Sequence, residues 1–413
     1  MSLFRSGAIA AIFLIAPAVH AQGTATPASI LSGESAFNPA ISLIMTGQYA
    51  DLSQDPDEYY IGGFLAGGEH GHGFGPGERG FGLGRTELAI SANIDPFFRG
   101  EAYITFDSHG GAEIEQGYVT TLGLPYGATG RFGRYLSGIG YVNEQHEDFW
   151  DFVDAPLAYK ALLGTQYRHD GVQLKWIAPT DLFIEFGIEG GRGLGFPASE
   201  ESVKNGFSSG AAYVHFGGDV GDSHSWRAGG AYLRTRANER ENHNADLNDP
   251  DEFAEFAFTG KSRVWVADLV WKWAPLGNPS VRNFIFQAEY IHRRERGELA
   301  YDDTEGSNTL GQLEDDFRAS QSGWYAQAVY QFMPRWRVGV RYDRVDSGTV
   351  EYAAPVLADY QPERKTAMID FSPSEFSRFR LQYARDESRP NLPDTQIYLQ
   401  YIMSVGAHGA HRF

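Results

Sequence analysis

The sequence predicts an all-β protein, a transmembrane antiparallel β-barrel of about 16 strands with long extracellular loops and short periplasmic turns. Three observations predict this fold: an export signal at the start, apolar and polar residues alternating with a period of two, and breaks that are alternately short and long. After Gln22, no stretch has the roughly 20 consecutive apolar residues that a membrane-spanning helix needs. We therefore expect strands, not helices, to cross the membrane.

The N-terminal residues predict export. Arg5 precedes an apolar run from Ala8 to Ala16, and Val19 and Ala21 supply the small residues that a signal peptidase accepts. We predict a signal peptide at residues 1–21, a short periplasmic segment at residues 22–40, and a single transmembrane β-barrel domain at residues 41–413. The expected location is the bacterial outer membrane.

Composition narrows the function classes. The chain has no cysteine, so neither disulfides nor thiolate metal sites can stabilise it, whereas a closed barrel satisfies its own backbone groups. The formal net charge of -19 argues against nucleic acid as a partner, because phosphates attract basic surfaces. Acidic loops that face water explain this charge better.

The strands are indicated by alternation. From Arg335 to Asp343 the even positions are apolar or aromatic, and the odd positions are charged or small. Residues 378–383 repeat this pattern, and residues 264–273 follow it with bulky residues on both faces. Lipid outside and water inside a barrel produce such two-faced strands.

The breaks between strands predict the topology. Short breaks with Pro or Gly lie at residues 94–96, 124–127, 178–180, 217–223, 274–280, 333–334 and 372–374. Long breaks lie at residues 51–80, 108–111, 135–170, 190–208, 237–260, 294–320, 343–363 and 386–394. These turns and loops join about sixteen strands and place both termini in the periplasm. A soluble sandwich or propeller is the alternative, but it would not need the aromatic residues that cluster near the strand ends.

The third long break, residues 135–170, is rich in large apolar residues such as Phe149, Trp150 and Phe152. Because these residues would be costly on an exposed loop tip, we predict that this loop folds inward and narrows the pore. The candidate constriction residues are Glu144, His146, Glu147, Asp148, Asp151, Asp154 and Lys160. Their carboxylates predict a constriction that attracts cations.

Charged side chains on inward positions set the field inside a pore. The candidates for the lumen wall are Arg335, Arg337, Arg341, Arg378, Arg380, Glu87, Glu101, Glu185 and Glu289. The arginines would favour anions and the glutamates would oppose them. Equally, these charges could pair with one another and only fill a polar interior.

Metal sites and catalysis have little support. Glu69, His70 and His72 in the first loop could ligate zinc at the surface, and acidic clusters in the loops could bind calcium, although hydrated loop tips explain both. The sequence predicts no resident cofactor. It also contains no nucleophile-elbow motif and no zinc-protease motif, so we expect no enzyme activity.

Several motifs resemble known families. The final strand alternates through Ile397, Leu399 and Tyr401 toward Phe413, and it resembles the closing strand that the barrel assembly machinery reads in outer-membrane proteins. Tyr401 and Phe413 are the assembly-signal residues that this resemblance implies. Residues 133–146, 150–152, 170–174 and 178–181 resemble a family of porin-sized proteobacterial proteins often labelled zinc-regulated or TonB-dependent outer-membrane receptors. More distantly, the chain resembles general and phosphate-selective porins.

The resemblance implies metal-linked uptake, but a TonB-dependent transporter has a 22-stranded barrel with a globular plug. The roughly twenty residues between Ala21 and the first strand are too few for a plug, which needs more than about a hundred. We therefore predict a porin-like channel for small hydrophilic solutes, including metal ions or their complexes as candidates. The alternative is a receptor that binds a metal or ligand on its extracellular loops without an open pore. Expected partners are outer-membrane lipid and lipopolysaccharide, the assembly machinery, and two further copies in a homotrimer.

Overall fold

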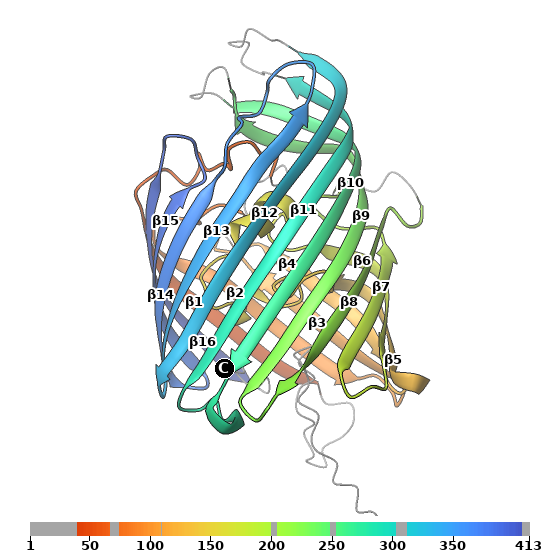
Figure 1. Ribbon diagram of the computed structural model, residues 1–413, viewed down its shortest axis with the longest axis vertical. Helices are drawn as coiled ribbons and strands as arrows, with labels where there is room; N and C mark the ends of the chain where they lie inside the picture. Colours follow the sequence, from red (N-terminus) through yellow and green to blue (C-terminus); the bar gives the residue numbers. More distant parts are fainter. Residues whose placement is uncertain are drawn as a thin grey trace, which may run out of the picture.

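The protein forms a closed barrel of sixteen antiparallel strands, in which β1 pairs with β16 (Figure 1). The computed structural model describes residues 39–66, 74–108, 110–199, 205–247, 253–302 and 312–406. The strands are β1 (Ala40–Leu52), β2 (Gly80–Asn93), β3 (Phe98–Phe106), β4 (Ala112–Thr121), β5 (Ala128–Leu136), β6 (Arg168–Ile177), β7 (Phe183–Gly191), β8 (Ser209–Val220), β9 (His224–Ala245), β10 (Phe253–Trp273), β11 (Asn283–Asp302), β12 (Leu313–Met333), β13 (Trp336–Glu351), β14 (Glu363–Ser374), β15 (Ser377–Glu387) and β16 (Asp394–Gly406). The predicted fold class is confirmed.

Short and long connections alternate around the barrel, as the sequence predicts. The turns at Pro125–Gly127 and Pro275–Gly277 are single 3-10 turns, and each begins with the proline that presets its backbone. Their second residues, Tyr126 and Leu276, have positive φ values of 62° and 52°, which a tight reversal requires. The long loops lie at the opposite end of the barrel, which is the extracellular end in barrels of this class.

Each strand has one face toward the lumen and one toward the membrane. Along β10, the side chains of Val264, Val266 and Val270 are buried inside, while those of Trp265 and Trp271 are exposed outside. Such an exposed apolar outer face is stable only in contact with lipid. The architecture therefore places the protein in the outer membrane of a bacterium.

Strands β9 to β13 are longer than the sequence predicts. The breaks expected at residues 237–260, 294–320 and 343–363 are largely strand, because β9 continues to Ala245, β10 starts at Phe253 and β12 starts at Leu313. These ends project beyond the other strands (Figure 1). Their outer faces are charged because they meet water, not lipid, and this polarity made them look like loops.

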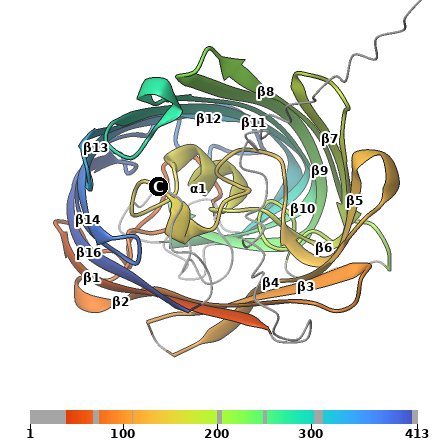
Figure 2. The same ribbon diagram turned by 90° about the horizontal axis from the view of Figure 1, so that it is seen from below.

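The third loop, here called L3 (residues 137–167), lies inside the barrel, as predicted. It contains the 3-10 turn Glu147–Phe149 and the helix α1 (Leu157–Leu163), and α1 lies within the ring of strands (Figure 2). All seven residues of α1 are buried. Six of them, all except Lys160, pack in a core with Ile61 and Phe64 of the first loop and with inward residues of β9 to β13. Part of the lumen is thus a hydrophobic core.

Some predictions fall on residues that lie outside the described ranges. These are the signal peptide at residues 1–21, most of the segment at residues 22–40, the loop residues Glu69, His70 and His72, and the terminal Phe413. Among the described residues, no helix has the length and the apolar character needed to cross a bilayer.

Candidate pore constriction and lumen wall

L3 crosses the lumen and is held to the wall by ion pairs on several sides. One of its ion pairs with the wall is at Glu144, whose carboxylate lies 3.0 Å from the Arg227 guanidinium of β9. Lys175 of β6 is 3.8 Å away from the same carboxylate, and His215 of β8 is 4.0 Å away. These partners come from β6, β8 and β9, so the pairing of these strands brings them to Glu144.

His146 attaches L3 to another part of the wall, at β2 and β4. Its Nδ1 lies 3.0 Å from Glu87 of β2 and 3.6 Å from Glu115 of β4. Burial alone would lower the pKa of His146, but the two carboxylates raise it to about 10, so the ring is a cation at neutral pH. Arg85 forms ion pairs with Glu87, Glu115 and Glu147, which joins L3 and both strands in one charged network.

Asp148 is the exception among the L3 carboxylates. It is buried, and its Oδ2 has no hydrogen-bond partner among the described residues. Burial and the nearby Glu87 carboxylate raise the pKa of Asp148 to about 7, although Arg85 opposes this change. Asp148 therefore changes charge close to neutral pH.

Asp151, Asp154 and Lys160 meet a basic wall. Asp151 lies 2.9 Å from Arg337 of β13, and the Asp154 carboxylate contacts Arg341 of β13, Arg364 of β14 and, at 2.8 Å, Lys160 of L3 itself. Burial would raise the pKa of Asp154, but Arg364, Lys160 and Arg341 hold it well below its usual range. Lys160 is buried, and burial lowers its pKa despite Asp154.

The predicted constriction residues are thus brought together around L3, but their charges are offset by wall cations. Every carboxylate except Asp148 pairs with Arg or Lys. The sequence predicts a constriction that attracts cations, but L3 would carry an excess of negative charge only if these ion pairs opened. Sequence reasoning missed Arg85, Arg227 and Arg364, although the period-two pattern of β14 could have placed Arg364 on the inner face.

The predicted arginines of the wall occupy two kinds of position. Arg337, Arg341, Arg378 and Arg380 are inward and buried. Asp370 of β14 lies 2.5 Å from Arg337, 3.9 Å from Arg378 and 3.0 Å from Arg380. The placement of Arg335 was wrong. It lies in the exposed turn between β12 and β13 with φ 73°, because this turn comprises residues 334–335 and so lies one residue later than expected.

The predicted glutamates face inward, but they differ in exposure. Glu87 and Glu185 pair with His146 and His215. Glu289 is fully enclosed and accepts hydrogen bonds from the backbone N–H of Val142 at 3.0 Å and from the hydroxyl of Tyr159 at 2.7 Å. It positions L3 and does not line a water-filled wall.

Glu101 belongs to a polar region that L3 covers less completely. Its carboxylate accepts from the Tyr118 hydroxyl at 2.9 Å and pairs with Arg99 at 3.1 Å. The side chains of Arg99 and Glu101 are 16% and 12% exposed, respectively. On β9 to β13, by contrast, the inward side chains of Leu233 and Ile291 have no exposure.

Among the residues that the structure describes, two groups of side chains have the composition of metal ligands: Glu87, Glu115 and His146, and Glu144, Glu185 and His215. In both groups a cation is already present, Arg85 in the first and Lys175 with Arg227 in the second. A metal ion would have to displace these cations. Tyr401, the described member of the predicted assembly signal, lies on the outer face of β16 with its ring 4.6 Å from that of Phe379.

The chain has a relative among known proteins. An uncharacterised protein of Aquifex aeolicus (strain VF5) is 31% identical over 407 residues, which cover 92% of this chain and 81% of the relative. The chain belongs to the same family as this Aquifex protein. No established family model matches it.

Solved structures share the fold at low identity. A loop L8 deletion mutant of OmpT, an outer membrane protein of Vibrio cholerae, aligns with a TM-score of 0.53 and 12% identity, over 89% of this chain and 99% of that chain. The outer membrane channel DcaP of Acinetobacter baumannii aligns with a TM-score of 0.51 and 11% identity, over 89% of this chain and 97% of that chain. At this identity the likeness establishes the barrel fold, and function must be argued from the site.

Proposed function

We propose that this protein is a selective channel for small hydrophilic solutes, and that L3 narrows its lumen. The observation that carries the proposal is the position of L3, which lies inside the barrel and is tied to the wall at Glu144, His146 and Asp154. A loop held in this way leaves less room than an empty barrel of the same strand number. Ion conductance should therefore be small and solute-dependent.

The proposed route runs along the inner faces of β2 to β4. Arg85, Arg99 and Glu101 keep partly exposed side chains there, whereas the apolar residues on the inner faces of β9 to β13 are sealed by α1. Water and ions favour a polar surface over an apolar one. Selectivity then depends on the sum of the charges along β2 to β4 and on Glu147 of L3, whose side chain is 35% exposed.

A cysteine-accessibility experiment in planar bilayers tests the route. The chain has no cysteine, so a single introduced thiol is the only target of a charged methanethiosulfonate reagent. We expect the reagent to reduce the conductance of Glu101→Cys and to leave that of Ile291→Cys unchanged. Absence of conductance from correctly folded wild-type protein would overturn the channel proposal, and block at Ile291→Cys alone would overturn the route.

Metal ions are the finer candidate for the solute. The two groups of two glutamates and one histidine support this, because such donors suit zinc when the neighbouring cations move away. Zinc added on either side should then block conductance in the wild type, and less so in His146→Ala. An unchanged conductance at saturating zinc would leave the channel proposal intact and remove zinc as its cargo.

The competing function is a receptor without an open pore, and one observation favours it. The core that unites α1, the first loop and β9 to β13 fills part of the lumen with apolar side chains.

For the assembly state we propose a homotrimer, since one of the similar structures, OmpT of Vibrio cholerae, is described in a trimer form. Sedimentation of the protein in detergent would test this state independently of conductance.

A further inference from the structure

Seven cations line the outer faces of four neighbouring strands, β9 to β12. The register aligns them in two rows: Arg236, Lys261, Arg296 and Arg318 in the upper row, and Arg234, Arg263 and Arg294 in the lower row. All seven side chains are exposed. We call this surface the basic rows.

Such an arrangement is unfavourable for the isolated chain. Like charges directly opposite each other on adjacent strands destabilise a sheet, and here the opposition repeats from strand to strand. Only Arg318 has a described carboxylate partner, Glu351 at 3.4 Å. Within the described ranges, no carboxylate lies within ion-pair distance of Arg236, Lys261 or Arg296, although the whole chain has a net charge of -19. The basic rows therefore need a neutralising anion, and the described part of the protein does not supply one.

The neighbouring aromatic residues fix the depth of the basic rows relative to the membrane. Directly below the lower row, Tyr232 of β9 and Trp265 of β10 stand side by side, with ring centroids 5.4 Å apart. Aromatic belts of this kind mark the boundary between hydrocarbon and headgroups. The outer face of β10 from Trp265 to Trp273 spans nine residues, about the length that a tilted strand needs to cross the hydrocarbon layer. The basic rows thus lie at the level of the outer headgroups.

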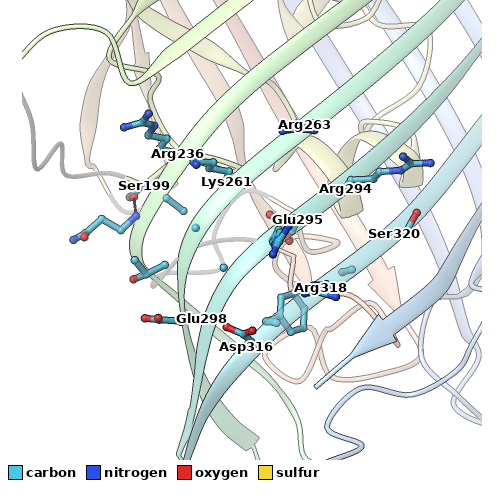
Figure 3. A pocket seen from close by; sticks show the side chains of 18 of the residues that line it. Ser199, Arg236, Lys261, Arg263, Arg294, Glu295, Glu298, Asp316, Arg318 and Ser320 are labelled. Carbon is cyan, nitrogen blue, oxygen red and sulfur yellow. Dashed lines mark hydrogen bonds between the residues drawn. The ribbon is translucent and has the colours of Figure 1, made fainter. Parts of the chain in front are cut away.

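The surface at this point is hollowed. A depression of about 980 Å³ is lined by Arg236, Lys261, Arg263, Arg294 and Arg318, with Glu298 and Asp316 at the edge away from the membrane (Figure 3). Phe207, whose side chain is 73% exposed, lies at the rim of the same depression. Cations and an exposed ring together fit an amphipathic ligand better than a simple ion.

We propose that the basic rows bind the phosphate groups of a phosphorylated glycolipid in the outer leaflet, that is, lipopolysaccharide. Guanidinium groups hold phosphate oxygens in pairs, and basic side chains near an anionic membrane surface each add to binding. The phosphates would occupy the space between the two rows. The acyl chains would then extend along Trp265 and the apolar outer face below.

The neighbouring strands β13 to β15 provide a matched control. Strands β13 to β15 also carry outward cations at their extracellular ends, but these have partners. Lys365 pairs with Glu363 at 2.7 Å, Arg385 pairs with Glu387 at 3.5 Å, and Arg344 donates to Gln361. Three cations can therefore be neutralised on β9 to β12 or on β13 to β15 with the same change in net charge.

The experiment measures binding of bisphosphorylated lipid A to the folded protein in detergent by native mass spectrometry. The test variant is R236Q/K261Q/R296Q, and the control is R344Q/K365Q/R385Q. We expect the test variant to bind about a hundredfold more weakly than the wild type, and the control to stay within about threefold. Dephosphorylated lipid A should bind the wild type as weakly as lipid A binds the test variant.

Every alternative outcome overturns the proposal. Equal binding by the test variant, an equal loss in the control, or equal affinity for dephosphorylated lipid A would each reject it. Displacement of lipid A by an equimolar amount of inorganic phosphate would assign the rows to a free anion instead. The resistance of both variants to SDS without heating verifies folding. Unchanged conductance separates this result from a failure of the channel proposal.

Discussion

Two parts of the barrel wall, β9 to β13 and β2 to β4, differ in what their inner faces contact. On β9 to β13 the inner residues Leu233, Val264 and Ile291 are sealed under α1, in a core like that of a soluble protein. On β2 to β4 the inner residues Arg99 and Glu101 keep part of their side chains exposed. Because L3 packs its apolar residues against β9 to β13, the lumen is asymmetric although the strand pattern repeats around the barrel.

An inward position on a barrel strand therefore has no fixed environment. Its polarity depends on whether a loop covers it, and L3 covers the apolar side chains while its carboxylates meet the charged ones at Arg341 and Arg364.

The largest effect is expected where L3 meets the basic wall. Asp154→Asn leaves Arg341, Arg364 and Lys160 without their shared carboxylate, and breaking a buried ion pair costs about 3–5 kcal/mol. The free energy of unfolding in urea, measured from lipid vesicles, should fall by that amount. Glu363→Gln, at an exposed pair on the outside, is the control and should change little. Equal losses in the two variants would contradict the clamping role of Asp154.

Packing of α1 should have the next largest effect. Leu162 has no exposure, so Leu162→Ala should cost about 2–5 kcal/mol through lost burial and the cavity left behind. L3 would also loosen and the channel conductance would rise. Leu269→Ala makes the same chemical change on the lipid-facing side of β10, where Leu269 is 42% exposed, and should cost less without affecting conductance. If both variants conduct alike, α1 does not restrict the lumen.

Asp148 should make L3 sensitive to pH. Its pKa of about 7 lies above that of an unfolded aspartate, so the folded protein binds more protons between about pH 4 and pH 7. The stability that this group contributes is present at low pH and is lost as the pH rises through 7. Glu87 and Arg85 of β2, together with His146 and Glu147 of L3, face the group and set this value.

Conductance recorded from pH 5 to pH 8 tests this prediction. We expect the wild type to become more open as Asp148 ionises, because L3 packs less firmly. Asp148→Asn should behave at every pH as the wild type does at low pH. A profile that is identical in wild type and variant would assign the pH dependence to other groups.

The smallest effect on stability is expected on the polar side. Glu101→Gln keeps an acceptor for the Tyr118 hydroxyl but removes a charge from the proposed route, so it should shift the reversal potential in a salt gradient toward anions. Stability should change by less than about 1 kcal/mol. Glu298→Gln removes the same charge from the outer surface of β11 and should leave the reversal potential unchanged. A shift in the control alone would move the route away from β2 to β4.

The sequence predicted several parts of the lumen, and others were hidden for physical reasons. The apolar residues of L3 indicated its inward fold, and the alternation in residues 335–343 placed Arg337 and Arg341 inside. It could not show that Arg364 lies opposite Asp154, 210 positions away, because that contact exists only once the strands that separate β5 from β14 have paired in register. The polar ends of β9 to β12 looked like loops because strands that rise above the membrane lose their apolar outer face.

What the sequence determined by itself is local: the two-faced strands, the Pro and Gly turns between them, and hence the number of strands and the direction of each. The tertiary structure decided which inner faces became a sealed core and which stayed polar, because this depends on where α1 rests. It also decided that Lys261 lies between Arg236 and Arg296, since hydrogen bonding between strands, and not position along the chain, places these charges side by side.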